Sequence, residues 1–175
     1  VPQGDMTLVE TVEDVAKLKF EPGTPLAFLT QTTLSVDDTH AMIEALKQRF
    51  PDIAGPRGED ICYATSNRQA AVKVLAPQVD MLLVIGGANS SNSLRLVEVA
   101  ERIGTDARLI QRGDDIDAEM LDGIGTIGLT AGASAPEVLV REVIDHLSRF
   151  RAVEERVITT TEENMVFKLP RQLTD

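Results

Sequence analysis

The stretch "LLVIGGANSSNSLRL", residues 82–96, changes character halfway along its length. Four large apolar residues lead into Gly86 and Gly87, and five small amide or hydroxyl side chains follow with no charge among them. An apolar-periodic segment then runs to Gly104, a residue type that often ends a helix. The pattern predicts a buried strand, a small polar loop and a helix, in that order.

Two other segments repeat this order of strand, polar loop and helix. Residues 26–50 and 126–150 each begin with an apolar run, pass through small polar residues and end in a helical pattern. A less regular unit at 60–78 contains a helix that Ser66 is placed to cap. Strands that alternate with helices of this length predict an α/β fold with mostly parallel sheets flanked by helices. Ligands of such sheets bind outside the carboxyl ends of the strands, where the polar loops lie.

The segments between these units are less regular. Residues 50–60 are rich in Pro and Gly and predict a boundary between domains. Residues 107–121 predict a strand followed by an acidic helix start. The tail from Arg151 has strand character, and we expect it to pack back on the fold.

Composition excludes several classes of function. The formal net charge is −11, and Lys and Arg are scattered, which argues against a nucleic-acid partner. Apolar runs are far shorter than the roughly 20 residues that cross a bilayer, and no signal pattern is visible, so we expect a cytoplasmic protein without a membrane partner. The single cysteine excludes an internal disulfide framework and a zinc site of several thiolates within this chain. Because Val1 is not Met and the first residues read like the inside of a domain, we expect a fragment.

The polar loops have two interpretations. A helix N-terminus offers unpaired backbone N–H groups and a partial positive charge, so small polar residues before it suit a phosphate. Any one such loop taken alone is more often explained by an ordinary N-cap. Three similar loops favour a ligand, although the glycines match neither a Walker motif nor a G-x-G-x-x-G motif, and a nucleotide is not indicated. The candidate phosphate contacts are the side chains of Thr32, Thr33, Ser90, Ser91, Asn92 and Ser134 and the backbone at Gly86, Gly87 and Gly132.

The potential catalytic side chains are few. Cys62 has two interpretations. It is either a small buried hydrophobic residue or, because it directly precedes a helix, a cysteine whose thiolate form the helix N-terminus would favour. His40 and His146 fall within predicted helices and are interpreted as surface or packing residues. Asp37 and Asp38 fall in a first helical turn, where carboxylates suit the helix dipole.

Four motifs in order make the chain resemble a known enzyme family. They are "TQTTLSVDDT" (30–39), "DICYATSNRQ" (60–69), "NSSNSLRL" (89–96) and "LTAGASAPE" (129–137). Together they resemble the LytB-type 4-hydroxy-3-methylbut-2-enyl diphosphate reductases, over a span from about Leu8 to about Leu169.

The resemblance implies a cloverleaf of three similar three-layer α/β lobes around a central cavity. Residues 1–58 would form the second half of the middle lobe, residues 59–150 the third lobe, and residues 151–175 a tail that packs back on the fold. It also implies a 4Fe-4S cluster held by three cysteines, of which Cys62 is the last. The other two cysteines, the substrate-binding histidines and the acidic proton donor of the family belong to an N-terminal portion that this sequence does not supply.

The resemblance further implies the roles of individual residues. Ser90, Ser91, Asn92 and Ser134 match the family's diphosphate contacts. Thr32 matches the residue near the substrate's hydroxymethyl end that assists proton delivery. Gly87 and Ala88 stand where relatives often have a polar or basic pair, which leaves the matched ligand residues intact.

The implied reaction belongs to the methylerythritol phosphate route to isoprenoids. It is a reductive removal of the allylic hydroxyl that yields isopentenyl and dimethylallyl diphosphates, with electrons from a ferredoxin or flavodoxin type donor. The chain alone would be inactive. The alternative from a different class is a noncatalytic phosphate-binding α/β module in which Cys62 is buried and idle.

Overall fold

Five consecutive apolar residues form the central strand of a three-stranded parallel sheet. This strand, β1 (Met81–Ile85), lies between β2 (Asp106–Ile110) and β3 (Ile127–Ala131). All five residues of β1 are buried because helices cover both faces of the sheet. Ile85 is paired with Ile110 on one side and with Ala131 on the other, so the three strands end at the same level.

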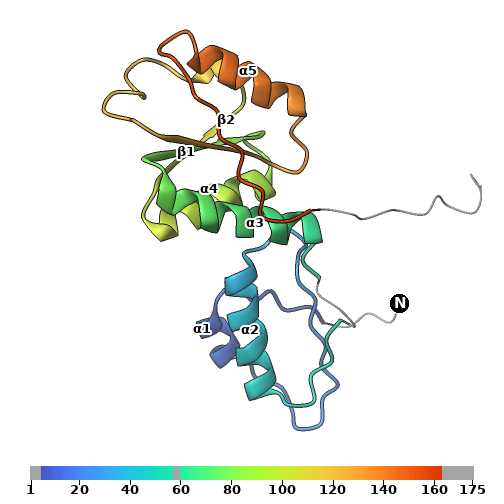
Figure 1. Ribbon diagram of the computed structural model, residues 1–175. Coiled ribbons are helices and arrows are strands. Elements are labelled where there is room, and N and C mark those ends of the chain that lie inside the picture. Colours follow the sequence, from blue (N-terminus) through green and yellow to red (C-terminus); the bar gives the residue numbers. More distant parts are fainter. Residues whose placement is uncertain (1–4, 57–59, 163–175) are drawn as a thin grey trace, which may run out of the picture.

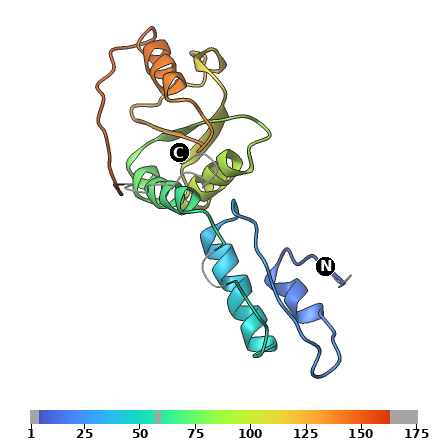
Figure 2. The same cartoon turned by 90° about the vertical axis from the view of Figure 1, so that its right-hand side faces the viewer.

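Alternate residues of β1 enter two separate cores. Leu82 and Val84 pack against α3 (Tyr63–Leu75) and α4 (Ser91–Ile103) on one face. Met81, Leu83 and Ile85 pack on the other face, where α5 (Glu137–Leu147) contributes Val143 and Leu147. Figures 1 and 2 show α3 and α4 side by side on one face of the sheet and α5 on the other. Two short 3-10 helices, η1 (Ala76–Gln78) and η2 (Gly113–Asp115), complete this lobe.

The structure is a computed structural model that describes residues 5–56 and 60–162. Residues 5–56 form a separate part below the lobe, with α1 (Val12–Lys17) and α2 (Val36–Arg49) packed together (Figure 1). The N-terminus of α2 points at the lobe and contacts it through α3 and α4. Across the described residues, no helix is both long and apolar enough to span a membrane.

Helices α3 and α4 run in the same direction. The C-terminal ends of both helices meet where the Thr105 hydroxyl donates to the carbonyl oxygen of Ala76, at the amino edge of the sheet. Both N-termini therefore lie at the carboxyl edge, where β1 ends. Gly104 ends α4 with φ 97°, a left-handed conformation that favours glycine.

The structure corrects three local expectations. The predicted strand at 26–30 is only an isolated parallel bridge between Ala27 and Ala54, because no further strand of the described residues lies beside it. Helix α3 begins before Ser66, since the N–H groups of Thr65 and Ser66 both bond to the carbonyl oxygen of Cys62. The acidic segment after β2 forms only the turn η2, because the Asp115 carboxylate accepts from the backbone at 111 and 112 instead of continuing a helix.

The chain after α5 is extended along the lobe. Within the described part of the tail, 151–162, no strand forms, and the segment passes from the end of α5 toward α3 (Figures 1 and 2). The Arg151 guanidinium donates to the carbonyl oxygens of Leu121 and Ile124, and Glu155 forms an ion pair with Arg141. The rest of the predicted tail, 163–175, lies outside the described residues.

Candidate functional site at the carboxyl edge

The loop after β1 closes directly onto the first turn of α4. Ser90 is the N-cap, and its Oγ accepts hydrogen bonds from the backbone N–H of Ser93 at 3.3 Å and from the Ser93 hydroxyl at 3.0 Å. The Ser90 Oγ therefore already takes part in two contacts within its own turn. Ser91 is exposed in the same turn. The N-cap interpretation of Ser90 is therefore confirmed.

Ser93 was not among the predicted site residues, yet it holds the loops together. It is completely buried, and its side chain lies between the backbones of Gly86 and Gly132, the residues that follow β1 and β3. A Cβ on either glycine would overlap the Ser93 Oγ, which explains why both positions need glycine. Strands β1 and β3 lie side by side and end at the same level, so the residues that follow them both approach Ser93. The one sequence signal for this approach is a glycine directly after each strand.

Asn92 carries a buried amide that lacks a partner. The residue is 7% exposed, and neither its Oδ1 nor its Nδ2 has a hydrogen-bond partner among the described residues. Its Nδ2 lies 3.7 Å from the place where a Cβ on Gly132 would be. A buried polar group without a partner costs about 1–3 kcal/mol, so such a group indicates a ligand or water that completes it.

Ser134 lies on the loop before α5 and is exposed. It borders a cavity of about 670 Å³ that extends from Gly86 and Gly87 to the space between η2 and α5. His146 forms part of the cavity wall, with its Nε2 3.1 Å from the carbonyl oxygen of Ile116 and its Nδ1 3.6 Å from Asp114 Oδ1. This placement agrees with the packing interpretation of His146.

Thr32 and Cys62 are adjacent although they come from different parts of the chain. The backbone N–H of Cys62 donates to the carbonyl oxygen of Thr32 at 3.3 Å. Two residues earlier on each segment, the Asp60 carboxylate accepts from the backbone N–H and the hydroxyl of Thr30, at 2.9 Å and 3.2 Å. Thr32 itself is exposed.

Cys62 is the N-cap of α3 and is exposed, so the alternative prediction that its side chain is buried is wrong. Its thiol stands at the N-terminus of a 13-residue helix. It is the one cysteine of the sequence, and the part of the chain that the structure describes has no group of three His, Cys, Asp or Glu placed to hold a metal. Three thiolates hold a cluster of the implied kind, so these 175 residues alone do not hold it.

The predicted site residues therefore form two groups at one edge of the sheet. Ser90, Asn92 and the loop of Ser134 meet around Ser93, and Thr32 meets Cys62 at the N-terminus of α3. Both groups belong to helix N-termini at the carboxyl edge, and their named residues are of the Ser, Thr, Asn and Cys types. Sequence reasoning missed Ser93 and also Gln69, whose contacts join the Thr32 segment to α3.

Comparison with known proteins gives consistent matches. The family model described as LytB protein matches residues 2–148. Proteins named 4-hydroxy-3-methylbut-2-enyl diphosphate reductase from Roseobacter denitrificans and Ruegeria pomeroyi are each 57% identical over 174 residues, which is 99% of this chain and 55% of each relative. The relative of that name from Edwardsiella ictaluri is 56% identical over 172 residues. The chain thus spans about half the length of the curated relatives it matches.

A solved structure agrees with these matches. The E-1-hydroxy-2-methyl-but-2-enyl-4-diphosphate reductase from Plasmodium falciparum superposes with a TM-score of 0.84 at 34% sequence identity. The superposition covers 94% of this chain and 52% of that one. The family model covers most of the chain, and the motifs at Thr32, Cys62, Asn92 and Ser134 lie within the matched span, so the chain belongs to the LytB protein family.

Proposed function

We propose that this chain is the C-terminal part of a 4-hydroxy-3-methylbut-2-enyl diphosphate reductase. In the complete protein, the allylic C–O bond of the substrate breaks, two electrons and two protons are taken up, and water leaves with isopentenyl or dimethylallyl diphosphate as product. The names of the relatives and the order of the motifs support this reaction.

The proposed arrangement of the complete protein is a three-lobed cloverleaf. Residues 1–58 would belong to its middle lobe, residues 59–150 would form the third lobe, and the tail from 151 would pack back on the fold. The parallel sheet flanked by helices within 60–150 and the separate part formed by 5–56 are consistent with this division.

The buried amide of Asn92 carries the proposal for substrate binding. The amide has no partner among the described residues, and it lies in the first turn of α4 beside the N-cap hydroxyl of Ser90. Ser91 and Ser134 add two exposed hydroxyls. Neutral donors at helix N-termini can bind a diphosphate without basic residues, so the net charge of −11 is no obstacle to the proposed site.

Cys62 would supply one ligand of an iron–sulfur cluster, and the other thiolates would come from outside these residues. The cluster, when bound, supplies the electrons of the reduction. A ferredoxin or flavodoxin type donor would then return electrons to the cluster. Thr32 lies beside Cys62, and its exposed side chain would assist proton transfer to the hydroxymethyl end of the substrate. The diphosphate contacts then fix which end of the substrate faces Thr32.

The test uses the full-length protein purified without oxygen. We expect a brown protein that reduces the diphosphate substrate with a chemical reductant, and loss of both colour and turnover in Cys62→Ala. A colourless full-length protein that binds inorganic pyrophosphate without turnover would support the noncatalytic phosphate-binding module instead.

A further inference from the structure

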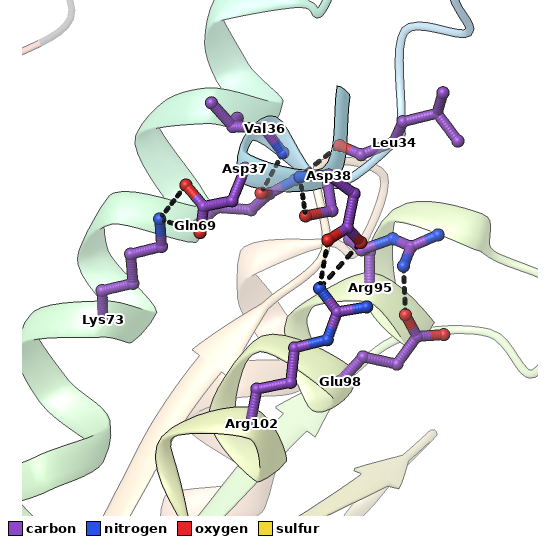
Figure 3. Close-up of polar contacts among 10 residues, drawn as sticks. Leu34, Val36, Asp37, Asp38, Gln69, Lys73, Arg95, Glu98 and Arg102 are labelled. Carbon is purple, nitrogen blue, oxygen red and sulfur yellow. Dashed lines mark hydrogen bonds and ion pairs between the residues drawn. The ribbon is translucent and has the colours of Figure 1, made fainter. Parts of the chain in front are cut away.

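Gln69 joins the segment that carries Thr32 to the helix that begins after Cys62. The residue is 1% exposed, and its amide makes two hydrogen bonds to the backbone of one short segment (Figure 3). Its Nε2 donates to the carbonyl oxygen of Leu34 at 2.8 Å, and its Oε1 accepts from the backbone N–H of Val36 at 3.0 Å. Two bonds to residues two apart fix the orientation of the segment as well as its distance from α3.

These bonds belong to a row of four contacts between segment 30–37 and segment 60–73. In chain order, the row consists of Thr30 with Asp60, Thr32 with Cys62, Leu34 and Val36 with Gln69, and Asp37 with Lys73. Gln69 follows Cys62 by seven residues, about two helical turns, so both lie on the same side of α3. The segment of Thr32 therefore lies along one side of the helix.

The contacts in this row differ in strength. The Asp37–Lys73 ion pair and the nearby Asp38–Arg102 pair are exposed to solvent, and such pairs contribute about 0–1 kcal/mol each (Figure 3). Thr32 and Cys62 are exposed and share a single bond of 3.3 Å. Gln69 alone is fully buried, and loss of its amide would leave the partly buried backbone groups at 34 and 36 without their partner, at up to about 1–3 kcal/mol each. Gln69 is thus the main anchor of the segment.

We propose that Gln69 is a positioning residue for the reaction, because its amide sets where the Thr32 hydroxyl stands relative to the Cys62 thiol. This inference rests on the proposed function, in which Thr32 and Cys62 serve one site. Gln69 touches neither substrate nor cluster ligand. Its effect reaches the reaction through the segment 32–36, and a displacement of about 1 Å in such a segment can lower a rate by about 100-fold.

The informative variant is Gln69→Glu in the full-length protein purified without oxygen. A glutamate has the same shape and still accepts from Val36, but the ionised form cannot donate to Leu34. Protonation restores the donor, and burial favours the protonated form of such a carboxyl. We expect kcat relative to wild type to fall by about 10-fold or more at the pH values where this carboxyl is ionised, with KM within about twofold of wild type, and to recover as the pH is lowered and the carboxyl is protonated.

Two further variants separate positioning from folding. Gln69→Met should lower kcat at every pH without recovery, while Lys73→Ala, which removes the exposed neighbouring contact, should leave kcat within about twofold. Iron content and the visible spectrum should stay at wild-type values in all three variants, because Cys62 is unchanged. Hydrogen exchange at the Cys62 and Val36 amides should accelerate in Gln69→Met and not in Lys73→Ala.

The outcomes distinguish the two proposals. A wild-type kcat in Gln69→Met, or a loss in Gln69→Glu without recovery at low pH, would overturn the positioning role while the reductase assignment stands. An inactive wild-type protein would overturn the proposed function, and the exchange rates at Cys62 and Val36 would still show whether Gln69 holds the segment.

Discussion

The backbone N–H of Cys62 and the carbonyl oxygen of Thr32 are joined by a hydrogen bond of 3.3 Å. The bond connects a loop of the N-terminal part to the first turn of α3 in the lobe. It places the proposed proton donor and the proposed cluster ligand on the same edge of the molecule. The side chains of both residues are exposed, so neither is used up in the packing of the core.

Removal of the Cys62 thiol should affect the cluster but not the fold. In the full-length protein, Cys62→Ala is expected to abolish bound iron and turnover, because a cluster of this kind depends on its thiolate ligands. The free energy of unfolding of the metal-free protein should change by less than about 0.5 kcal/mol, since the side chain is exposed. Iron analysis, a turnover assay and urea unfolding check these three values. Wild-type turnover in this variant would refute the assignment of Cys62.

Asn92→Ala should separate binding from stability. The substitution removes a buried amide without a partner and introduces the residue with the highest helix propensity, so stability without ligand should stay the same or rise by up to about 1 kcal/mol. Inorganic pyrophosphate at a concentration 100 times its dissociation constant should stabilise the wild type by about 2.7 kcal/mol. This stabilisation should be lost in Asn92→Ala. Urea unfolding with and without pyrophosphate measures both effects.

Ser148→Ala is the matched control for Asn92→Ala. Ser148 ends α5, and its hydroxyl donates to the carbonyl oxygen of Ile144, so the control also removes a polar side chain from a helix end. Its response to pyrophosphate should match wild type. If Asn92→Ala instead destabilises the protein by more than about 2 kcal/mol and keeps that response, its amide has a structural partner and no role in binding.

The contact of Ser93 with two glycines predicts a specific rescue. Gly132→Ala should destabilise the protein by about 1–3 kcal/mol, because the new Cβ overlaps the Ser93 Oγ. The same Cβ lies 3.4 Å from the Ser93 Cβ, an ordinary contact, so most of this cost should disappear in a Ser93→Ala background. A double-mutant cycle by chemical denaturation measures the coupling.

Gly86→Ala provides the comparison for that cycle. Its Cβ would lie 2.5 Å from the Ser93 Cβ as well as overlapping the Oγ, so Ser93→Ala should not rescue it. Equal rescue at both glycines would show that the ends of β1 and β3 do not approach Ser93 as described.

Thr11 and Asp14 form a capping box at the start of α1, and this box predicts that the stability of α1 depends on pH. Hydrogen bonds from Lys17 and then from Thr11 lower the pKa of Asp14 from its ordinary value of 3.8 to about 2. Because the pKa is lower in the folded state, the carboxylate stabilises α1 fully above about pH 4, and this stabilisation is lost as the pH falls through about 2. Asp14→Asn should therefore speed amide exchange in α1 at pH 6 and make no difference below pH 2. A titration of the Asp14 carboxyl by NMR with a midpoint near 3.8 would contradict this.

The lobe was predictable because its segments carry their own signals. The apolar run of β1, the polar turn at Ser90 and the ending at Gly104 are all local, and the structure places each where the pattern does. The strand predicted at 26–30 failed for the opposite reason. A strand needs partners for its backbone groups, and apart from the bridge between Ala27 and Ala54, none of the described residues supplies them.

The sequence by itself determined the α/β character of the chain, the family and the residue types of the candidate site, because hydrophobic period and motif order are properties of neighbours along the chain. Only the tertiary structure decided that Ser93 lies between Gly86 and Gly132, that the Asn92 amide is buried without a partner, and that Gln69 anchors the segment of Thr32. The contacts of Ser93 and Gln69 join residues from separate segments, and the burial of Asn92 depends on how such segments pack. They depend on strand register and helix packing, which the local pattern does not specify.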